Sequence, residues 1–176
     1  LKLTKAPLIF RRGLFYVRRK LGLKSTTCSP IVPVRSSSLN WENYSMISGS
    51  CCCGAVKFEL SAAPSMIGTC HCSRCRKVGA STIAFVKKED LKWVQGKDQV
   101  QLYEPTSPYI YGRCFCKICG SSLGEILSEE DSFPIAANAL DGDHGLKNQS
   151  HEFVGEKPSW YEICDNAPQN EGHPQS

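Results

Sequence analysis

Nine of the eleven cysteines in this 176-residue chain fall in three short clusters. The clusters are Cys51-Cys52-Cys53, Cys70-His71-Cys72-Ser73-Arg74-Cys75 and Cys114-Phe115-Cys116-Lys117-Ile118-Cys119. Thiols at this spacing can turn toward one ion, whereas a disulfide between such near neighbours is strained. Closely spaced cysteines in an intracellular chain indicate metal binding, and zinc favours thiolate ligands in tetrahedral geometry. The spacing therefore predicts zinc sites.

The first and third clusters share a feature that favours a closed structural site. Cys53 is followed directly by Gly54, and Cys119 by Gly120. Glycine supplies the positive φ that closes such a turn, and it lets backbone N–H groups approach the sulfur. One structural zinc site is therefore assigned to four thiols, those of Cys51, Cys53, Cys116 and Cys119.

The alternation of side chains along an extended strand tests this grouping. Residues two apart share a face, so Cys51 and Cys53 can act together while Cys52 points away. The same rule does not exclude Cys114, which shares a face with Cys116 and stays open as a ligand. The sequence assigns no role to the isolated Cys28 and Cys164.

The middle cluster differs because no glycine follows it. It offers three sulfurs, those of Cys70, Cys72 and Cys75. Three protein ligands with an open fourth position are typical of a reactive zinc, so these cysteines are the candidate catalytic group. His71 lies between two of them and is expected to point away, with a role as fourth ligand as the alternative.

The elements that must position these cysteines are short strands. Val56, Phe58 and Leu60 alternate with Lys57 and Glu59, the pattern of a half-buried strand. Further strands are expected at 82–86, 91–94, 100–103, 109–115, 121–127, 132–139, 151–154 and 160–163. No long helical pattern appears after residue 46. The expected fold is mainly β, with several small twisted antiparallel sheets stapled by zinc-cysteine knuckles. Its bounds are 46–168, with a frayed tail at 169–176.

Residues 1–45 have a different composition. Nine of the 21 basic side chains lie in residues 1–41, where there is no acidic residue. Apolar residues at one helical face, arginines beside them and a serine-rich stretch are typical of a mitochondrial or plastid transit peptide. A disordered basic tail is the alternative, which would leave the protein in the cytoplasm.

The charge of the remaining chain limits its partners. Residues 42–176 hold 12 basic against 17 acidic side chains. Binding to a nucleic-acid backbone needs clustered lysine and arginine, so the folded part is not expected to bind nucleic acid. No apolar run approaches the ~20 residues needed to span a bilayer, which excludes a membrane helix.

Taken in order, the cysteine motifs resemble the glutathione-dependent formaldehyde-activating enzyme family, which includes centromere protein V. The matching motifs are Gly49-Ser50-Cys51-x-Cys53-Gly54, Cys70-His71-Cys72-Ser73-x-Cys75-Arg76-Lys77, Phe115-Cys116-x-x-Cys119-Gly120-Ser121 and the supporting tail Ala139-Leu140-Asp141, His151-x-Phe153-Val154 and Lys157-x-x-Trp160. The resemblance runs from about residue 48 to 168. It implies a fold of several coiled β-sheets and two zinc ions per chain, with a glutathione sulfur docking at the zinc of the middle cluster. Cys52 and the order Lys157-Pro158-Ser159-Trp160 depart from the family pattern without touching a ligand.

The chemistry of an open three-thiolate zinc agrees with this implication. Such a site carries a net charge of about −1, so its natural incoming ligand is a fourth thiol, which deprotonates on binding. The expected reaction is that of a carbon-sulfur lyase, in which glutathione adds to formaldehyde and gives S-(hydroxymethyl)glutathione. Three nearby cations could meet the glutathione carboxylates: Arg74, Arg76 and Lys77. A thiol-binding carrier without turnover and a zinc-stabilised interaction module are the alternatives.

Overall fold

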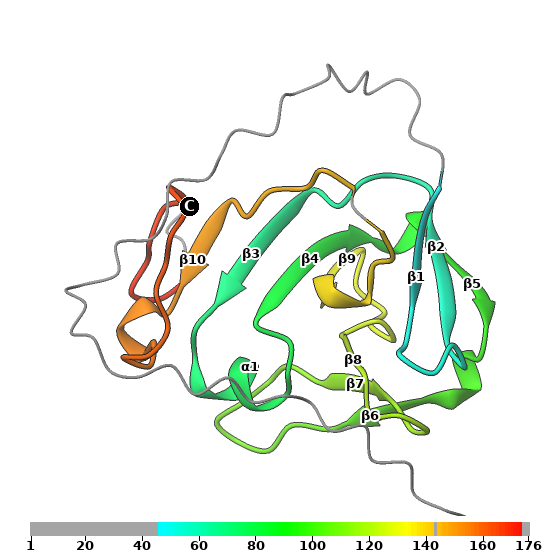
Figure 1. The fold of residues 1–176 in the computed structure, drawn as a ribbon. Helices are drawn as coiled ribbons and strands as arrows, with labels where there is room; N and C mark the ends of the chain where they lie inside the picture. The colour runs from blue at the N-terminus through cyan, green and yellow to red at the C-terminus, as the bar shows by residue number, and fades with distance from the viewer. Residues whose placement is uncertain (1–45, 143, 174–176) are drawn as a thin grey trace, which may run out of the picture. The chain divides into compact units, whose positions relative to one another are not determined.

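The structure is a computed structural model that describes residues 46–142 and 144–173. The predicted basic leader, residues 1–45, lies outside the described residues. The described part contains ten β-strands in three sheets and one short α-helix (Figure 1). This confirms the prediction of a mainly β fold with several small sheets. No helix in the described part is long and apolar enough to cross a membrane.

The first sheet has the order β1-β2-β5, and both of its pairs are antiparallel. Its strands are β1 (Ile47–Ser50), β2 (Lys57–Leu60) and β5 (Leu91–Gln95). As the alternation predicted, Phe58 and Leu60 are buried in the core while Lys57 faces outward. The Phe58 ring packs directly over Gly49, where a Cβ atom would lie 2.2 Å from it. This sheet therefore positions the segment directly after β1, which carries the first cysteine cluster.

The second sheet has the order β10-β3-β4-β9 and carries the middle cysteine cluster. Its strands are β3 (Met66–Cys70), β4 (Thr82–Lys87), β9 (Ser132–Ala136) and β10 (Ser150–Glu152). The pairs β3–β4 and β4–β9 are antiparallel. The pair β10–β3 is parallel and was not predicted, and its register places Glu152 opposite Cys70.

The third sheet has the order β6-β7-β8 and is antiparallel. Its strands are β6 (Val100–Tyr103), β7 (Arg113–Cys116) and β8 (Ser122–Gly124). Figure 1 shows β6 and β7 below β3, β4 and β9. Strand β7 begins at Arg113 and ends at Cys116, so one short strand serves both cysteine groups.

The only α-helix of the described part, α1 (Ser73–Lys77), directly follows β3. Its N-cap is Cys72, whose thiol accepts a hydrogen bond from the backbone N–H of Cys75. Gly79, with φ +70°, follows the end of the helix. The described part also has four 3₁₀ turns, of which the last follows the final strand: η2 (Lys88–Asp90), η3 (Lys97–Gln99), η4 (Ala137–Ala139) and η5 (Val154–Glu156).

Several sequence-based strand boundaries were wrong. The segment 160–163 forms no strand, and Trp160 is 75% exposed. The expected strand at 109–115 begins only at Arg113, because residues 109–112 form a loop. Two strands, β1 and β3, were not predicted. Both are short and contain a glycine, a residue depleted in strands, so their local signal is weak.

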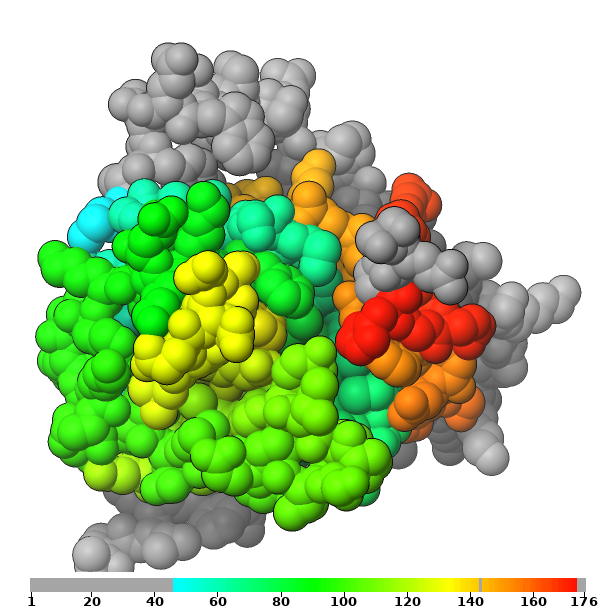
Figure 2. Space-filling model, turned by 180° about the vertical axis from the view of Figure 1, so that it is seen from behind, coloured from blue at the N-terminus to red at the C-terminus, as the bar shows by residue number. Residues whose placement is uncertain are grey.

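Part of the segment expected to fray is hydrogen-bonded to β10. The backbone N–H of Asn170 donates to the carbonyl of His151, and the N–H of His151 donates to the carbonyl of Pro168, both at 2.8 Å. Farther on, His173 lies 3.3 Å from the carboxylate of Glu152. In the view from behind, the orange and red C-terminal part lies together on the right, beside green atoms of earlier segments (Figure 2).

Gly124 at the end of β8 is expected to tolerate no side chain. Its φ is +70°, and a Cβ atom would lie 2.6 Å from the backbone nitrogen of Ala136 in β9. A left-handed conformation costs a non-glycine residue roughly 1–2 kcal/mol, and the clash with rigid backbone adds to this. We expect Gly124→Ala to lower the free energy of unfolding, measured with urea, by more than about 2 kcal/mol.

Gly79→Ala is the matched control. Gly79 has the same φ, but nothing lies within 4 Å of its added Cβ. Only the conformational cost of roughly 1–2 kcal/mol is expected there. Equal losses in the two variants would show that β8 does not pack as closely on β9 as described.

Candidate functional site

Four thiols from two distant parts of the chain meet beside the end of β1. Cys51 and Cys53 follow β1, whereas Cys116 ends β7 and Cys119 lies in the turn after it. Their sulfur atoms all lie within 4.8 Å of one another. The Sγ atoms of Cys51 and Cys53 are 3.5 Å apart, and those of Cys53 and Cys116 are 3.9 Å apart. The group therefore joins the first sheet to the third.

The backbone around this group is arranged for thiolates. Gly54 and Gly120 both have positive φ, as their positions after a cysteine predicted. The backbone N–H of Val56 donates to the sulfur of Cys51 at 3.3 Å. The hydroxyl and backbone N–H of Ser121 lower the pKa of Cys119 to about 5. These donors stabilise negative charge on sulfur.

The second group lies at the junction of β3 and α1. Cys70 ends β3, Cys72 caps α1, and Cys75 lies within the helix. Their three sulfur atoms are within 4.8 Å of one another, and no further cysteine, histidine or carboxylate of the described residues joins the group. Cys70 and Cys75 are buried, while Cys72 is half-buried. A short segment thus presents three converging thiols.

An arginine from the third sheet lies against this group. Arg113 in β7 donates from Nη2 to the sulfur of Cys75 at 3.8 Å and from Nη1 to Glu125 Oε1 at 2.7 Å. The hydrogen bond from Cys70 lowers the pKa of Cys75 to about 5, with further contributions from Cys72 and Arg113. Burial raises the pKa of Glu125, and the charge of Arg113 opposes this. The cation therefore favours a thiolate at Cys75.

Both groups fit zinc. Zinc–thiolate bonds of about 2.3 Å in tetrahedral geometry place sulfur atoms about 3.8 Å apart, close to the separations seen here. Four thiols complete such a shell, whereas three leave one position open. The exposed Cys52 and the buried Cys114 belong to neither group. Cys114, which strand alternation left open as a ligand, therefore lies outside the four-thiol group.

His71 is turned away from the thiols and belongs to neither group. Its Nε2 lies 2.8 Å from Nδ1 of His151 in β10, and Nε2 of His151 lies 3.0 Å from Oδ1 of Asp165. Both rings are buried. The backbone N–H of His71 also donates to the carbonyl of Glu152 at 2.8 Å. These contacts hold the segment between Cys70 and Cys72 against β10.

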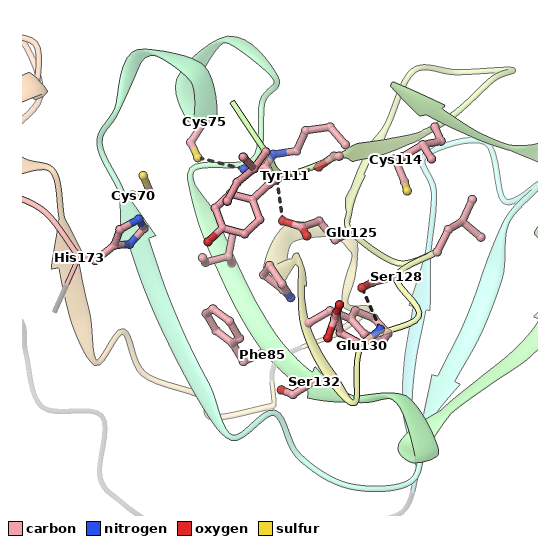
Figure 3. Close-up of a pocket in the computed structure, with 18 of the residues that line it drawn as sticks. Cys70, Cys75, Phe85, Tyr111, Cys114, Glu125, Ser128, Glu130, Ser132 and His173 are labelled. Atoms are coloured by element: carbon pink, nitrogen blue, oxygen red, sulfur yellow. Dashed lines mark hydrogen bonds and ion pairs between the residues drawn. The ribbon is translucent and has the colours of Figure 1, made fainter. Parts of the chain in front are cut away.

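A pocket of about 740 Å³ opens beside the three-thiol group. Cys70 and Cys75 form part of its wall, as Figure 3 shows, and Cys114 lies across the pocket from them. Arg113 and Glu125 also line it. A pocket of this size, lined by two of the three converging thiols and by a cation, is suited to bind and hold a small thiol or its reaction partner.

Comparison with known proteins agrees with this arrangement. The sequence profile described as "glutathione-dependent formaldehyde-activating enzyme" matches residues 46–156, which include every cysteine of both groups. The chain belongs to this family. A protein of Halomonas elongata named for the same enzyme is 33% identical over 130 residues, which are 67% of this chain and 81% of the relative.

A solved structure is also similar. The crystal structure of a Rhodobacter sphaeroides protein aligns with a TM-score of 0.45 and 29% sequence identity. The alignment covers 55% of this chain and 90% of that one.

The three cations predicted to bind the glutathione carboxylates of this family's substrate lie on α1. Arg74 donates to the carbonyl of Tyr111, and its guanidinium lies 4.8 Å from the centre of the Tyr109 ring. Arg76 donates from Nε to the carbonyl of His71 at 3.1 Å. Lys77 is exposed on α1. All three lie outside the lining of the pocket.

The site residues that the sequence did not predict, Arg113 and Glu152, lie on strands outside the middle cysteine cluster. Arg113 stands next to a cysteine cluster, but only the β7–β8 hairpin shows that it meets Glu125. Glu152 reaches Cys70 through the unexpected parallel pairing of β10. No local motif marks either residue. In this family member the pocket is therefore assembled mostly from residues outside the cysteine motifs.

Breaking the pair of Arg113 and Glu125 is expected to destabilise the domain. Their side chains are only 14% and 15% exposed. Removing one partner of such a pair leaves a buried charge unpaired, which typically costs about 3–5 kcal/mol. We expect Glu125→Leu to lower the free energy of unfolding in urea by about 3 kcal/mol.

The double variant Arg113→Met/Glu125→Leu is the control, because it removes both charges. It should recover most of that loss, since apolar replacements of a buried pair are often neutral. A double variant as unstable as Glu125→Leu alone would show that the loss comes from packing rather than from an unpaired charge.

Proposed function

We propose that this chain holds two zinc ions and adds glutathione to formaldehyde. One ion would be held by Cys51, Cys53, Cys116 and Cys119, and the other by Cys70, Cys72 and Cys75. The observation that carries the proposal is the second group, in which three thiols converge without a fourth protein ligand among the described residues, and two of them, Cys70 and Cys75, line a pocket. The activity is that of a carbon-sulfur lyase of the S-(hydroxymethyl)glutathione synthase type.

A bound zinc would stabilise an incoming thiol as its thiolate at neutral pH. In the reaction, a bond forms between the glutathione sulfur and the formaldehyde carbon while the C=O π bond opens. The proton lost from the thiol ends on the former carbonyl oxygen. Holding both molecules together supplies most of the acceleration.

The chain's own residues prepare the site for this reaction. The guanidinium of Arg113, close to the sulfur of Cys75, offsets part of the negative charge that three thiolates create. Glu125 fixes the guanidinium in place at 2.7 Å. The contacts of His71 with His151 and Glu152 hold the ligand segment rigid, so the three sulfurs stay convergent.

The test is the loss of formaldehyde in the presence of glutathione, followed with and without the zinc-loaded protein. We expect a rate above the spontaneous one that rises with protein concentration and is retained in Cys52→Ser. Glutathione binding without any rate increase would instead make the protein a thiol carrier. If the protein neither binds glutathione nor accelerates the loss of formaldehyde, that result would contradict the proposal and favour an interaction module.

A further inference from the structure

The pocket beside Cys70 and Cys75 is larger and more apolar than formaldehyde requires. Its volume is about 740 Å³, whereas formaldehyde is scarcely larger than a water molecule, whose share of liquid volume is about 30 Å³. Side chains from several elements give it an apolar wall: Met66, Ile83, Phe85, Leu102, Ile110 and Leu127. Figure 3 shows Phe85 in the same cavity as Cys70 and Cys75. Formaldehyde has no substituent that could contact this wall.

The charges around the pocket disfavour an anionic occupant. Four carboxylates line it, those of Glu104, Glu125, Glu130 and Glu152. The one arginine among the lining residues, Arg113, is already paired with Glu125. Glu152 is buried at the pocket with His173 3.3 Å away. A molecule with a carboxylate substituent would meet like charges without a free cation.

The same charges bear on where glutathione lies. Glutathione carries two carboxylates, and the cations of α1, Arg74, Arg76 and Lys77, lie outside the pocket lining. Because like charges at short range are costly in a partly buried site, the tripeptide is better placed outside the pocket, toward α1. That leaves the apolar interior for the other reactant.

We propose that the pocket binds an uncharged aldehyde with an apolar substituent of several carbon atoms, to which the thiol adds. This inference rests on the proposed function and extends its substrate class beyond formaldehyde. The sulfur–carbon bond forms as the C=O π bond opens, and the thiol proton ends on the oxygen, so the product is a thiohemiacetal. Apolar burial of the substituent provides the affinity.

The direct test uses unreactive probes on the zinc-loaded, full-length protein. Benzyl alcohol has the shape of benzaldehyde but cannot react with a thiol; methanol lacks the apolar group, and 4-(hydroxymethyl)benzoate adds a carboxylate to it. We expect NMR titration to show that benzyl alcohol binds at least about tenfold more tightly than either of the others. Equal affinities, or tighter binding of the carboxylate probe, would overturn the proposal.

A pocket-filling variant locates the binding. Ile83 lies in β4 and lines the pocket, whereas Val94 in β5 is exposed and lies outside its lining. We expect Ile83→Trp to weaken benzyl alcohol binding at least about tenfold, while Val94→Trp leaves it unchanged. Unchanged binding in a folded Ile83→Trp would place the probe elsewhere and overturn the proposal. If Ile83→Trp does not fold, the probe series on the unchanged chain still decides.

Failure of this inference can be told apart from failure of the proposed function. Acceleration with formaldehyde but not with benzaldehyde, together with weak binding of benzyl alcohol, would overturn the aldehyde class alone. Absence of glutathione binding would overturn the proposed function, whatever the affinities of the three alcohol probes. Acceleration with benzaldehyde that exceeds the spontaneous rate, and that 4-carboxybenzaldehyde does not share, supports the inference.

Discussion

Cys116→Ser is expected to leave most molecules unfolded or aggregated. Cys116 is buried and belongs to the four-thiol group that ties the chain after β1 to the end of β7. Binding of a structural zinc contributes folding free energy of about 10–16 kcal/mol in small zinc peptides. A domain of this size has a net stability of only about 5–15 kcal/mol. Loss of even part of the metal contribution therefore removes the folded state, as circular dichroism and gel filtration would show.

Cys52→Ser is the matched control for this result. Cys52 lies beside two of the proposed ligands but is exposed and belongs to neither group. Its contact with Ser121 comes from the backbone N–H, which the substitution preserves. The control should stay folded with two zinc ions per chain by elemental analysis. A folded Cys116→Ser that retains both ions would refute the closed site.

Cys75→Ser is expected to keep the fold and lose the chemistry. The three ligands of this group lie within six consecutive residues, so loss of their zinc frees only the segment around α1. The protein should bind one zinc ion in place of two, and its melting temperature should change far less than in Cys116→Ser. Glutathione binding and the acceleration of formaldehyde loss should both fall to background.

The two substitutions together test which group is which. Chelator titration of the unchanged protein should remove one ion before the other, because three ligands enclose an ion less than four. Cys114→Ser, buried and outside both groups, should retain both ions. The reverse pattern, an unfolded Cys75→Ser and a folded Cys116→Ser without thiol binding, would mean that the structural and reactive sites are interchanged.

Sequence spacing could predict the thiol groups because each cysteine cluster is local in sequence, and a glycine after the cluster marks the two distant clusters that form the four-thiol group. Cys70, Cys72 and Cys75 lie on one strand end and one helical turn, and Gly54 and Gly120 mark the turns of the other group by their positive φ. Strand β2 was equally predictable, since its buried side chains alternate with outward ones.

The rest depended on pairings that no local pattern encodes. Strand β1 contains Gly49, where only a glycine leaves room for the ring of Phe58 from the next strand. A glycine does not by itself indicate a strand. The parallel pairing of β10 with β3 joins residues about 80 apart in sequence. The pocket and its charges follow from these pairings, so Glu152 and Arg113 could be recognised only in the folded chain.

The central claim is that a thiol binds directly at the Cys70, Cys72 and Cys75 group. Replacing zinc with cobalt and titrating with glutathione tests it most directly, because thiolate-to-cobalt absorption bands report each sulfur on the metal. The bands should change and saturate at one glutathione per chain, and Cys75→Ser should show no change. Glutathione that binds without altering the bands, or alters them equally in Cys75→Ser, would contradict the claim.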